Sequence, residues 1–230
     1  MSQPVRIVSL LFPNVTQLDL TGPVQVFSRL PGVEQHVVWH RIEPVPTDAG
    51  FSIVPTSTFA DASQADVLFV PGGQGAFELF EDEQALDFLR RQAAGARYVT
   101  SVCTGSFALA AAGLLDGRRA TSHWGSLRLL ERLGAIPTAE RVVRDGKVIT
   151  GAGVSSGIDF ALTLASELFG SDVAKRAQLA IEYDPNPPFD AGSPMRPGAD
   201  PEHVADVVER MNRYRGPLVD RAAERLRRVR

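Results

Sequence analysis

The only cysteine of the chain, Cys103, lies between an expected strand and an expected helix. Residues 98–102 are mostly β-prone and residues 107–112 form helix readily. In such a turn the sulfur meets unpaired N–H groups of the first helical turn, and the helix dipole favours the thiolate. We therefore predict a nucleophilic cysteine with a pKa below ~8.5, the value of free cysteine. A buried, inert cysteine is the alternative, because free cysteine is among the most buried residue types.

A second candidate is Asp19, a carboxylate between two leucines at the start of an expected helix. Unpaired charge is costly to bury, so a carboxylate in apolar surroundings needs an explanation. If Asp19 lies close to Cys103, burial and thiolate repulsion should raise its pKa and make it a proton donor near neutral pH. The alternative is a side chain that faces water and interacts favourably with the helix N-terminus.

A glycine-rich loop, residues 71–75 (Pro-Gly-Gly-Gln-Gly), follows an apolar strand and precedes a helix. It lacks the Lys-Ser/Thr of a Walker loop and is a weak nucleotide signal. Its backbone N–H groups could instead stabilise an anion beside the Cys103 turn, or the loop could be a plain turn. His123 could line the same cleft, although a structural histidine is the alternative. No Cys, His and Asp residues have zinc-ligand spacing.

Composition is that of an ordinary globular protein of 230 residues with a net charge of -3. The charge argues against nucleic acid as a partner. A single cysteine cannot form an internal disulfide, so the sequence gives no reason to expect an oxidising compartment. The apolar run near the N-terminus is too short to span a bilayer and precedes no signal-peptide cleavage pattern. We therefore expect a cytoplasmic protein that binds no membrane.

The order of elements predicts an α/β fold, a doubly wound and mostly parallel sheet with helices on both faces. Asp145-Gly146 is a signal for a hairpin between two short strands. We expect a core domain over residues 1–183 and a proline-rich arm with a helical extension over 184–230. The expected strands include 5–12, 37–42, 66–70 and 98–102, and the expected helices include 15–30, 78–94, 154–169 and 201–230.

The C-terminal extension presents two further questions. Gly216-Pro217 is a point at which the last helix could break. Apolar residues at spacings of three and four, Val204, Val207, Val208 and Met211, predict one buried helix face. Our hypothesis is that the arm and helix pack on a neighbouring subunit. The alternative is packing on their own subunit.

Five segments together resemble the PfpI-type superfamily, related to class I glutamine amidotransferases, and more narrowly the isonitrile hydratases. They are LFPNVTQLDLTGPVQVF, VLFVPGGQGAFEL, SVCTGSFALAAAGLLDGRRATSHW, GAGVSSGIDFALTLASELFG and QLAIEYDPNPPFDAGSP. Regulators of the AraC type share similar segments, but no helix-turn-helix region follows the core of this chain. The resemblance implies a flavodoxin-like sandwich and a homodimer.

By match of motif, the resemblance makes Cys103 the nucleophile and Asp19 its acid partner. Thr104 becomes the neighbouring hydroxyl and N–H donor, and Gly73 supplies another N–H. Thr104 replaces the histidine of the protease-like branch, and Asp19 replaces the glutamate of the deglycase-like branch. Both departures favour hydration of a small apolar isonitrile to a formamide through a thioimidate on Cys103, without cofactor or metal. A non-catalytic sensor that reads oxidation or ligand binding at Cys103 is the alternative function.

Overall fold

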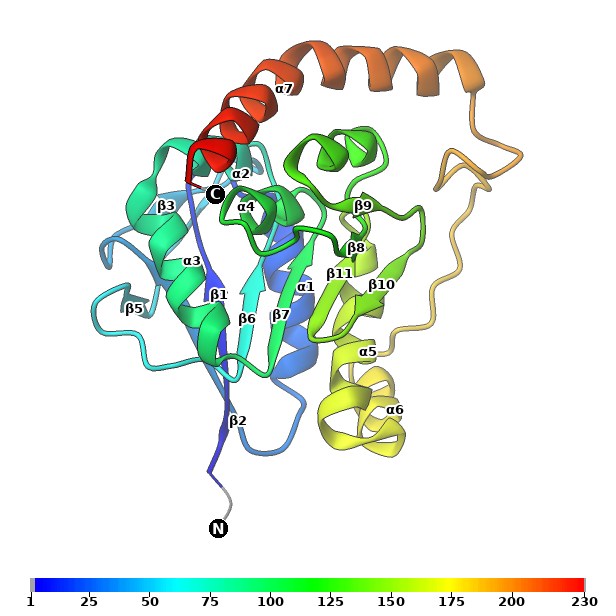
Figure 1. Cartoon of the computed structure of the whole chain (residues 1–230). Coiled ribbons are helices and arrows are strands. Elements are labelled where there is room, and N and C mark those ends of the chain that lie inside the picture. The colour runs from blue at the N-terminus through cyan, green and yellow to red at the C-terminus, as the bar shows by residue number, and fades with distance from the viewer. Residues whose placement is uncertain (1–2, 230) are drawn as a thin grey trace.

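The structure is a computed structural model that describes residues 3–229. Within this range, the centre is a seven-stranded sheet in the order β10-β11-β7-β6-β1-β2-β5 (Figure 1). Its neighbouring strands run parallel except for the antiparallel pair β10–β11. The strands span β1 Val5–Leu10, β2 Val33–Trp39, β5 Ser57–Thr58, β6 Val67–Val70, β7 Tyr98–Val102, β10 Val142–Asp145 and β11 Val148–Gly151. The predicted doubly wound, mostly parallel sheet is therefore confirmed.

Two short strand pairs lie outside this sheet. In one, β3 Val45–Pro46 is antiparallel to β4 Ser52–Ile53, and in the other β8 Arg119–Ala120 is parallel to β9 Ile136–Pro137. The predicted hairpin is present, because β10 and β11 pair across a turn in which Gly146 has a φ of 60°.

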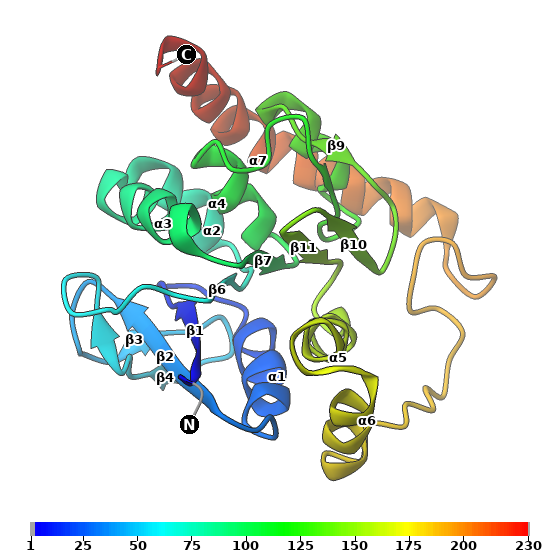
Figure 2. The same cartoon turned by 60° about the horizontal axis from the view of Figure 1, so that its bottom comes forward.

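Helices cover both faces of the sheet (Figure 2). One face carries α1 Gln17–Phe27, α5 Ser156–Phe169 and α6 Ser171–Ala180. The other carries α2 Gly75–Glu78, α3 Glu83–Gly95 and α4 Gly105–Ala111, with the 3₁₀ helices η1 Leu79–Glu81 and η2 Leu127–Leu133. The helix expected from residue 78 is divided, since Asp82 accepts the N–H of Ala85 and caps a new helix there.

The core lies between the sheet and these helices. Phe69 on β6 stacks on Phe160 of α5 with ring centroids 5.5 Å apart, and both side chains are buried. The near-continuous apolar sequence of β1 fits a central strand that is covered on both sides. The carboxyl edge of the sheet thus carries the turns that contain Gly73 and Cys103, and the start of α1 with Asp19.

The last helix, α7 Pro201–Val229, continues through Gly216 and Pro217, so the expected break is wrong. The helix bends instead along its course (Figure 1), which agrees with the effect of an internal proline. It contacts α2, α4 and η2 of its own chain and buries Val219 and Ala222 there. This part of α7 therefore packs on its own chain, and our hypothesis that the arm and helix also pack on a neighbouring subunit remains a prediction.

Candidate active site

Cys103 occupies a strained turn between β7 and α4. Its φ is 55°, a left-handed conformation that few side chains adopt, and such strain gathers at functional sites. Its N–H donates to the carbonyl groups of Gly151 at 3.0 Å and Ala152 at 2.7 Å. Its carbonyl accepts the hydroxyl groups of Ser106 at 3.1 Å and Ser122 at 2.9 Å. These four bonds fix the backbone of the turn from which the sulfur projects.

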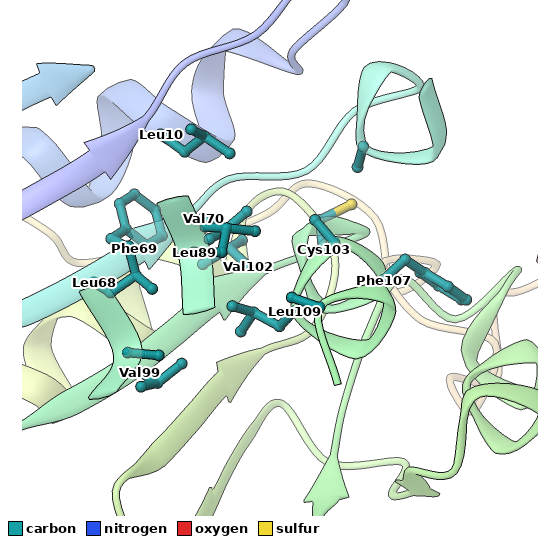
Figure 3. Close-up of a cluster of buried hydrophobic side chains, with 14 of the residues drawn as sticks. Leu10, Leu68, Phe69, Val70, Leu89, Val99, Val102, Cys103, Phe107 and Leu109 are labelled. Atoms are coloured by element: carbon teal, nitrogen blue, oxygen red, sulfur yellow. The ribbon is translucent and has the colours of Figure 1, made fainter. Parts of the chain in front are cut away.

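The sulfur lies at the boundary of the apolar core. Figure 3 shows it directed away from Val70 and Val102, while Phe107 follows one turn along α4. Gly105 permits this arrangement, because a Cβ there would overlap the carbonyl oxygens of Val70 and Pro71. The thiol is 4% exposed, so a reactant must be small or must enter through local motion.

Asp19 in α1 is fully buried and lies beside Cys103. Its Oδ2 accepts the N–H of Gly72 at 3.0 Å, while its Oδ1 accepts no hydrogen bond of ordinary geometry from the described residues. Burial raises the pKa of Asp19 to about 7, against the lowering effects of the Cys103 side chain and the Gly72 N–H. The predicted juxtaposition and the rise in pKa by burial agree with the structure, and the water-facing alternative is wrong. The expected contribution of Cys103 is wrong in sign, because its side chain lowers the pKa of Asp19.

Gly72 marks the point at which the site residues converge. A Cβ added there would lie 2.6 Å from Asp19 Oδ2, 2.6 Å from the Thr104 nitrogen and 2.8 Å from the Cys103 Cβ. Only a glycine leaves space for these three groups to approach one another. Sequence analysis singled out the loop but not this residue.

Thr104 and Gly73 are joined by two hydrogen bonds. The Gly73 N–H donates to Thr104 Oγ1 at 2.8 Å, and the Thr104 hydroxyl lies 2.9 Å from the Gly73 carbonyl oxygen. The backbone N–H of Thr104 interacts with the Cys103 sulfur and favours its thiolate. In this arrangement the Thr104 N–H reaches the sulfur, while the Thr104 hydroxyl is held by Gly73.

The pKa of Cys103 shifts in the direction opposite to our prediction. Burial raises it well above its ordinary value, the Asp19 charge raises it further, and the Thr104 N–H lowers it only in part. The expectation of a pKa below ~8.5 considered the helix terminus and omitted the cost of burying a charged sulfur. Within the pair, Asp19 disfavours ionisation of Cys103, whereas the Cys103 side chain favours ionisation of Asp19.

His123 is no direct partner of the sulfur in the described residues. Its Nδ1 accepts the N–H of Gly125 at 3.2 Å, its ring stacks on Trp124, and burial lowers its pKa. The structural interpretation of His123 fits these contacts. Within residues 3–229, no three His, Cys, Asp or Glu side chains gather where they could hold a metal ion. In the same range, no helix has the length and apolarity needed to cross a membrane.

The sequence did not identify one residue that lies near the site. Arg215 of α7 approaches the start of α2, although it is 141 residues from Gln74 in sequence. Its charge favours the thiolate of Cys103. No motif or spacing marks this arginine, because only the packing of α7 brings it to the site.

Known proteins resemble this chain over most of its length. The model of the DJ-1/PfpI family matches residues 5–167. The isonitrile hydratase of Pseudomonas putida is 53% identical over 223 residues, which cover 96% of this chain and 98% of that protein. The Parkinson disease protein 7 homolog of Danio rerio is 33% identical over 181 residues, which cover 76% of this chain and 96% of that protein.

Solved structures agree with these sequence relationships. A THiJ/PfpI family protein from Pseudomonas syringae has a TM-score of 0.90 and 43% identity to this chain. The match covers 97% of this chain and 91% of the crystallised one. The flavodoxin-like fold and the superfamily predicted from the sequence are thereby confirmed, and the chain belongs to the DJ-1/PfpI family.

Proposed function

We propose that this protein is an isonitrile hydratase, which adds water to R–N≡C and releases an N-substituted formamide. The observation that best supports this proposal is the buried pair of Cys103 and Asp19. In this pair a potential nucleophile lies beside a carboxyl group with a pKa of about 7. The 53% identity to the Pseudomonas putida isonitrile hydratase over almost the whole chain supports the proposal.

In the first step the Cys103 thiolate attacks the terminal carbon of the isonitrile. That carbon takes the proton of the Asp19 carboxyl group, which leaves an Asp19 carboxylate and a thioimidate, R–N=CH–S, on the cysteine. A carboxyl group with a pKa of about 7 suits this role, because it is protonated in part at neutral pH and still releases its proton. The Oδ1 of Asp19, which accepts no hydrogen bond of ordinary geometry from the described residues, would carry that proton.

In the second step water attacks the thioimidate carbon. The Asp19 carboxylate takes one proton of this water, and the second proton passes from the hydroxyl of the tetrahedral adduct to the former imine nitrogen as the adduct collapses. The C–S bond breaks, the thiolate and the protonated Asp19 are restored, and R–NH–CHO leaves. Thr104 orients the reactants, and Gly73 holds the Thr104 hydroxyl. No step needs a metal or an organic cofactor.

The substrate we propose is small and apolar. The isonitrile carbon is both nucleophilic and electrophilic, so recognition of the substrate needs no charged group. The Cys103 sulfur borders a core of aliphatic and aromatic side chains (Figure 3), which suits an apolar R group. Cyclohexyl isocyanide is a suitable test compound on these grounds.

The decisive experiment mixes purified protein with cyclohexyl isocyanide and follows N-cyclohexylformamide by mass spectrometry. We expect turnover by the wild-type protein and none by Cys103→Ser, since no second thiol exists to replace the nucleophile. A rapidly quenched wild-type reaction should carry an adduct of one isonitrile mass on Cys103. A folded Cys103→Ser variant with wild-type turnover would contradict the covalent route. Oxidation of Cys103 without any formamide would favour a sensor.

Assembly and location form the last part of the proposal. We propose a homodimer that uses the surface of α1 and α5, where a groove of about 380 Å³ runs between Leu18, Ile158 and Tyr183. Leu18, an exposed large apolar side chain on this face, is one that a partner subunit would cover. Light scattering of the wild type and Leu18→Glu tests the dimer. We also propose a cytoplasmic location, which cell fractionation tests.

A further inference from the structure

The segment that leads into α1 is held on both sides by neighbouring turns. Val15 forms one β-bridge with Thr47 and another with Gly73. The Asp48 N–H also donates to the Val15 carbonyl oxygen at 3.0 Å. The start of α1 therefore lies between the glycine-rich loop of the site and the turn that joins β3 to β4, residues 47–51. We call the latter the β3–β4 turn.

Asp48 in the β3–β4 turn caps α1 from outside the helix. Thr16 occupies the N-cap position, but its hydroxyl makes no capping bond to its own helix. That hydroxyl donates instead to Asp48 Oδ2 at 2.7 Å, and the Gln17 N–H donates to Asp48 Oδ1 at 3.3 Å. One carboxylate thus holds both the N-cap residue and the first residue of the helix, a favourable place for a negative charge.

The β3–β4 turn is held in shape by its own hydrogen bonds. The N–H and the hydroxyl of Thr47 both donate to the Phe51 carbonyl oxygen, at 2.9 Å and 2.7 Å. The Ala49 N–H donates to the Thr47 hydroxyl oxygen at 3.3 Å. Gly50 has a φ of 84°, which a glycine adopts without strain. The turn therefore presents Asp48 to α1 from an ordered backbone.

The capped turn of α1 is joined to the site by a closed ring of three hydrogen bonds. The Thr16 N–H donates to the Gly72 carbonyl oxygen at 2.9 Å, and the Gly72 N–H donates to Asp19 Oδ2 at 3.0 Å. The Asp19 N–H closes the ring, since it donates to the Thr16 carbonyl oxygen at 2.9 Å. A displacement of Thr16 would therefore move the Asp19 carboxyl group relative to Gly72.

We propose that Asp48 is a positioning residue for isonitrile hydration, because it fixes Thr16 and thereby holds the Asp19 carboxyl group against Gly72. Proton transfer depends steeply on position, and a displacement of about 1 Å can cost about 100-fold in rate. Asp48 itself touches no reacting atom in the mechanism. The inference rests on the proposed function for its effect on turnover, whereas the bond between Asp19 and Gly72 can be observed without turnover.

The charge of Asp48 is an influence separate from its hydrogen bonds. Burial is the largest cause of the raised pKa of Asp19, and the charge of Asp48 raises it further. Asp48→Asn removes the charge and keeps the shape, because the amide oxygen can accept the Gln17 N–H and the amide nitrogen can donate to the Thr16 hydroxyl oxygen. Asp48→Ala removes the charge and both hydrogen bonds. The two variants together therefore separate positioning from charge.

The first readout is the hydration of cyclohexyl isocyanide by the wild type and the two variants. We expect kcat of Asp48→Ala to fall about tenfold and KM to change less than about twofold, because only the proton-transferring group is displaced. Asp48→Asn should recover most of kcat.

Asp61→Ala is the matched control for Asp48→Ala. Asp61 is also an exposed aspartate that accepts a threonine hydroxyl, that of Thr58 at 2.6 Å, but it lies after β5 and makes no contact with α1. Its kcat should equal that of the wild type.

The second readout is the Gly72 amide in NMR spectra, which needs no turnover. Labelling with 13C-proline and 15N-glycine selects the Pro-Gly pairs of the chain, whose amides belong to Gly32, Gly72 and Gly198. Asp19→Asn identifies the Gly72 signal, because the Gly72 N–H donates to Asp19. In Asp48→Ala we expect this proton to shift upfield and to exchange faster with solvent, while Asp48→Asn and Asp61→Ala keep the wild-type signal. The signals of Gly32 and Gly198 should not change.

A folded Asp48→Ala protein with an unchanged Gly72 signal overturns the inference, and so does one with the wild-type kcat. An Asp48→Asn protein as slow as Asp48→Ala overturns it as well, since charge would then be the cause. If Asp48→Ala does not fold, Thr16→Val loses only the 2.7 Å bond and should change the Gly72 signal less but in the same direction. An unchanged signal in Thr16→Val would then overturn the inference.

The inference and the proposed function fail separately. If the wild type forms no formamide while the Gly72 signal changes as expected, hydration fails and Asp48 still holds Asp19 in place. If the wild type forms formamide and Asp48→Ala does so equally fast, hydration stands and the role of Asp48 fails.

Discussion

At the scale of single residues, burial determines what Cys103 and Asp19 can do. In water the carboxyl group would be ionised and the thiol neutral at pH 7. In the protein both groups are enclosed, and burial raises the pKa of each. The Asp19 charge raises the pKa of Cys103 further, whereas the Cys103 side chain lowers the pKa of Asp19. The Thr104 N–H and the charge of Arg215 lower the pKa of Cys103 only in part.

Replacement of Asp19 tests this view through activity. Asp19→Asn keeps the shape of the side chain and can still accept the Gly72 N–H, but it has no proton to transfer. We expect isonitrile hydration to fall at least about 100-fold, the lower range for loss of a general acid. Circular dichroism should show an unchanged fold. Wild-type turnover by the folded variant would assign proton transfer to water or to another group.

The same variant also gives a prediction for stability against pH. Asp19 has a pKa of about 7 in the folded protein and about 4 in an unfolded chain, so the folded state binds the proton more tightly. Its contribution to stability is complete below pH ~4 and is lost as the pH rises through about 7. Relative to Asp19→Asn, the wild type should lose about 2 to 4 kcal/mol between pH 4 and 8.

Urea unfolding at several pH values measures this difference. Asp172→Asn is a suitable control, because Asp172 is exposed in the first turn of α6. Its stability curve should run parallel to that of the wild type. Parallel curves for Asp19→Asn and the wild type would mean that Asp19 is ionised in the folded protein at neutral pH.

At the scale of elements, two strand-to-helix turns meet to form the site. The β7–α4 turn supplies Cys103 and Thr104, and the β6–α2 turn supplies Gly72 and Gly73. Because β6 and β7 are parallel neighbours, both turns leave the sheet at the same edge. The N–H groups of the second turn then bind side chains of α1 and of the first turn. Loop geometry, and not side chains alone, thus assembles the reactive pair.

Gly72→Ala tests this close approach. The new Cβ would overlap Asp19 Oδ2 and the Thr104 nitrogen, each at 2.6 Å, and would push the two turns apart. We expect the free energy of unfolding to fall by about 1 to 3 kcal/mol, as for other overpacked sites. The rate of isonitrile hydration should fall more than about tenfold. Thermal unfolding and the formamide assay measure the two effects.

Gly192→Ala provides the comparison for this substitution. Nothing lies within 4 Å of a Cβ at Gly192, so the same chemical change should alter neither stability nor turnover. Wild-type turnover by Gly72→Ala would contradict this expectation. It would mean that the two turns can move apart without disturbing proton transfer from Asp19.

At the scale of the whole molecule, local sequence patterns predicted the elements better than they predicted the environment of the site. Apolar runs, the Asp145-Gly146 turn and the position of Cys103 depend on neighbours in sequence, and all appear in the structure. The direction of the Cys103 pKa shift depends on burial by distant segments and was predicted wrongly. Arg215 depends on how α7 crosses the fold, and no local signal identified it.

The division into a core of residues 1–183 and an extension of residues 184–230 remains a prediction, and the packing of α7 sharpens it. The extension buries Val219 with no exposed surface against its own chain and carries Arg215 to the site. Truncation after Tyr183 should therefore uncover apolar surface of α2, α4 and η2. We expect a clearly lower melting temperature and slower alkylation of Cys103, together with an unchanged affinity of the proposed dimer.

Thermal unfolding, alkylation and light scattering of the truncated protein measure these three expectations. Dimer affinity is expected to persist because the proposed interface lies on α1 and α5, on the face of the sheet opposite α7 (Figure 2). Met195→Ala, a change at a side chain that is 89% exposed in the arm, controls for minor alterations of the extension and should affect none of them. A truncated protein that becomes monomeric at unchanged melting temperature would instead place the extension between subunits, because an extension packed on its own core cannot be removed without loss of stability.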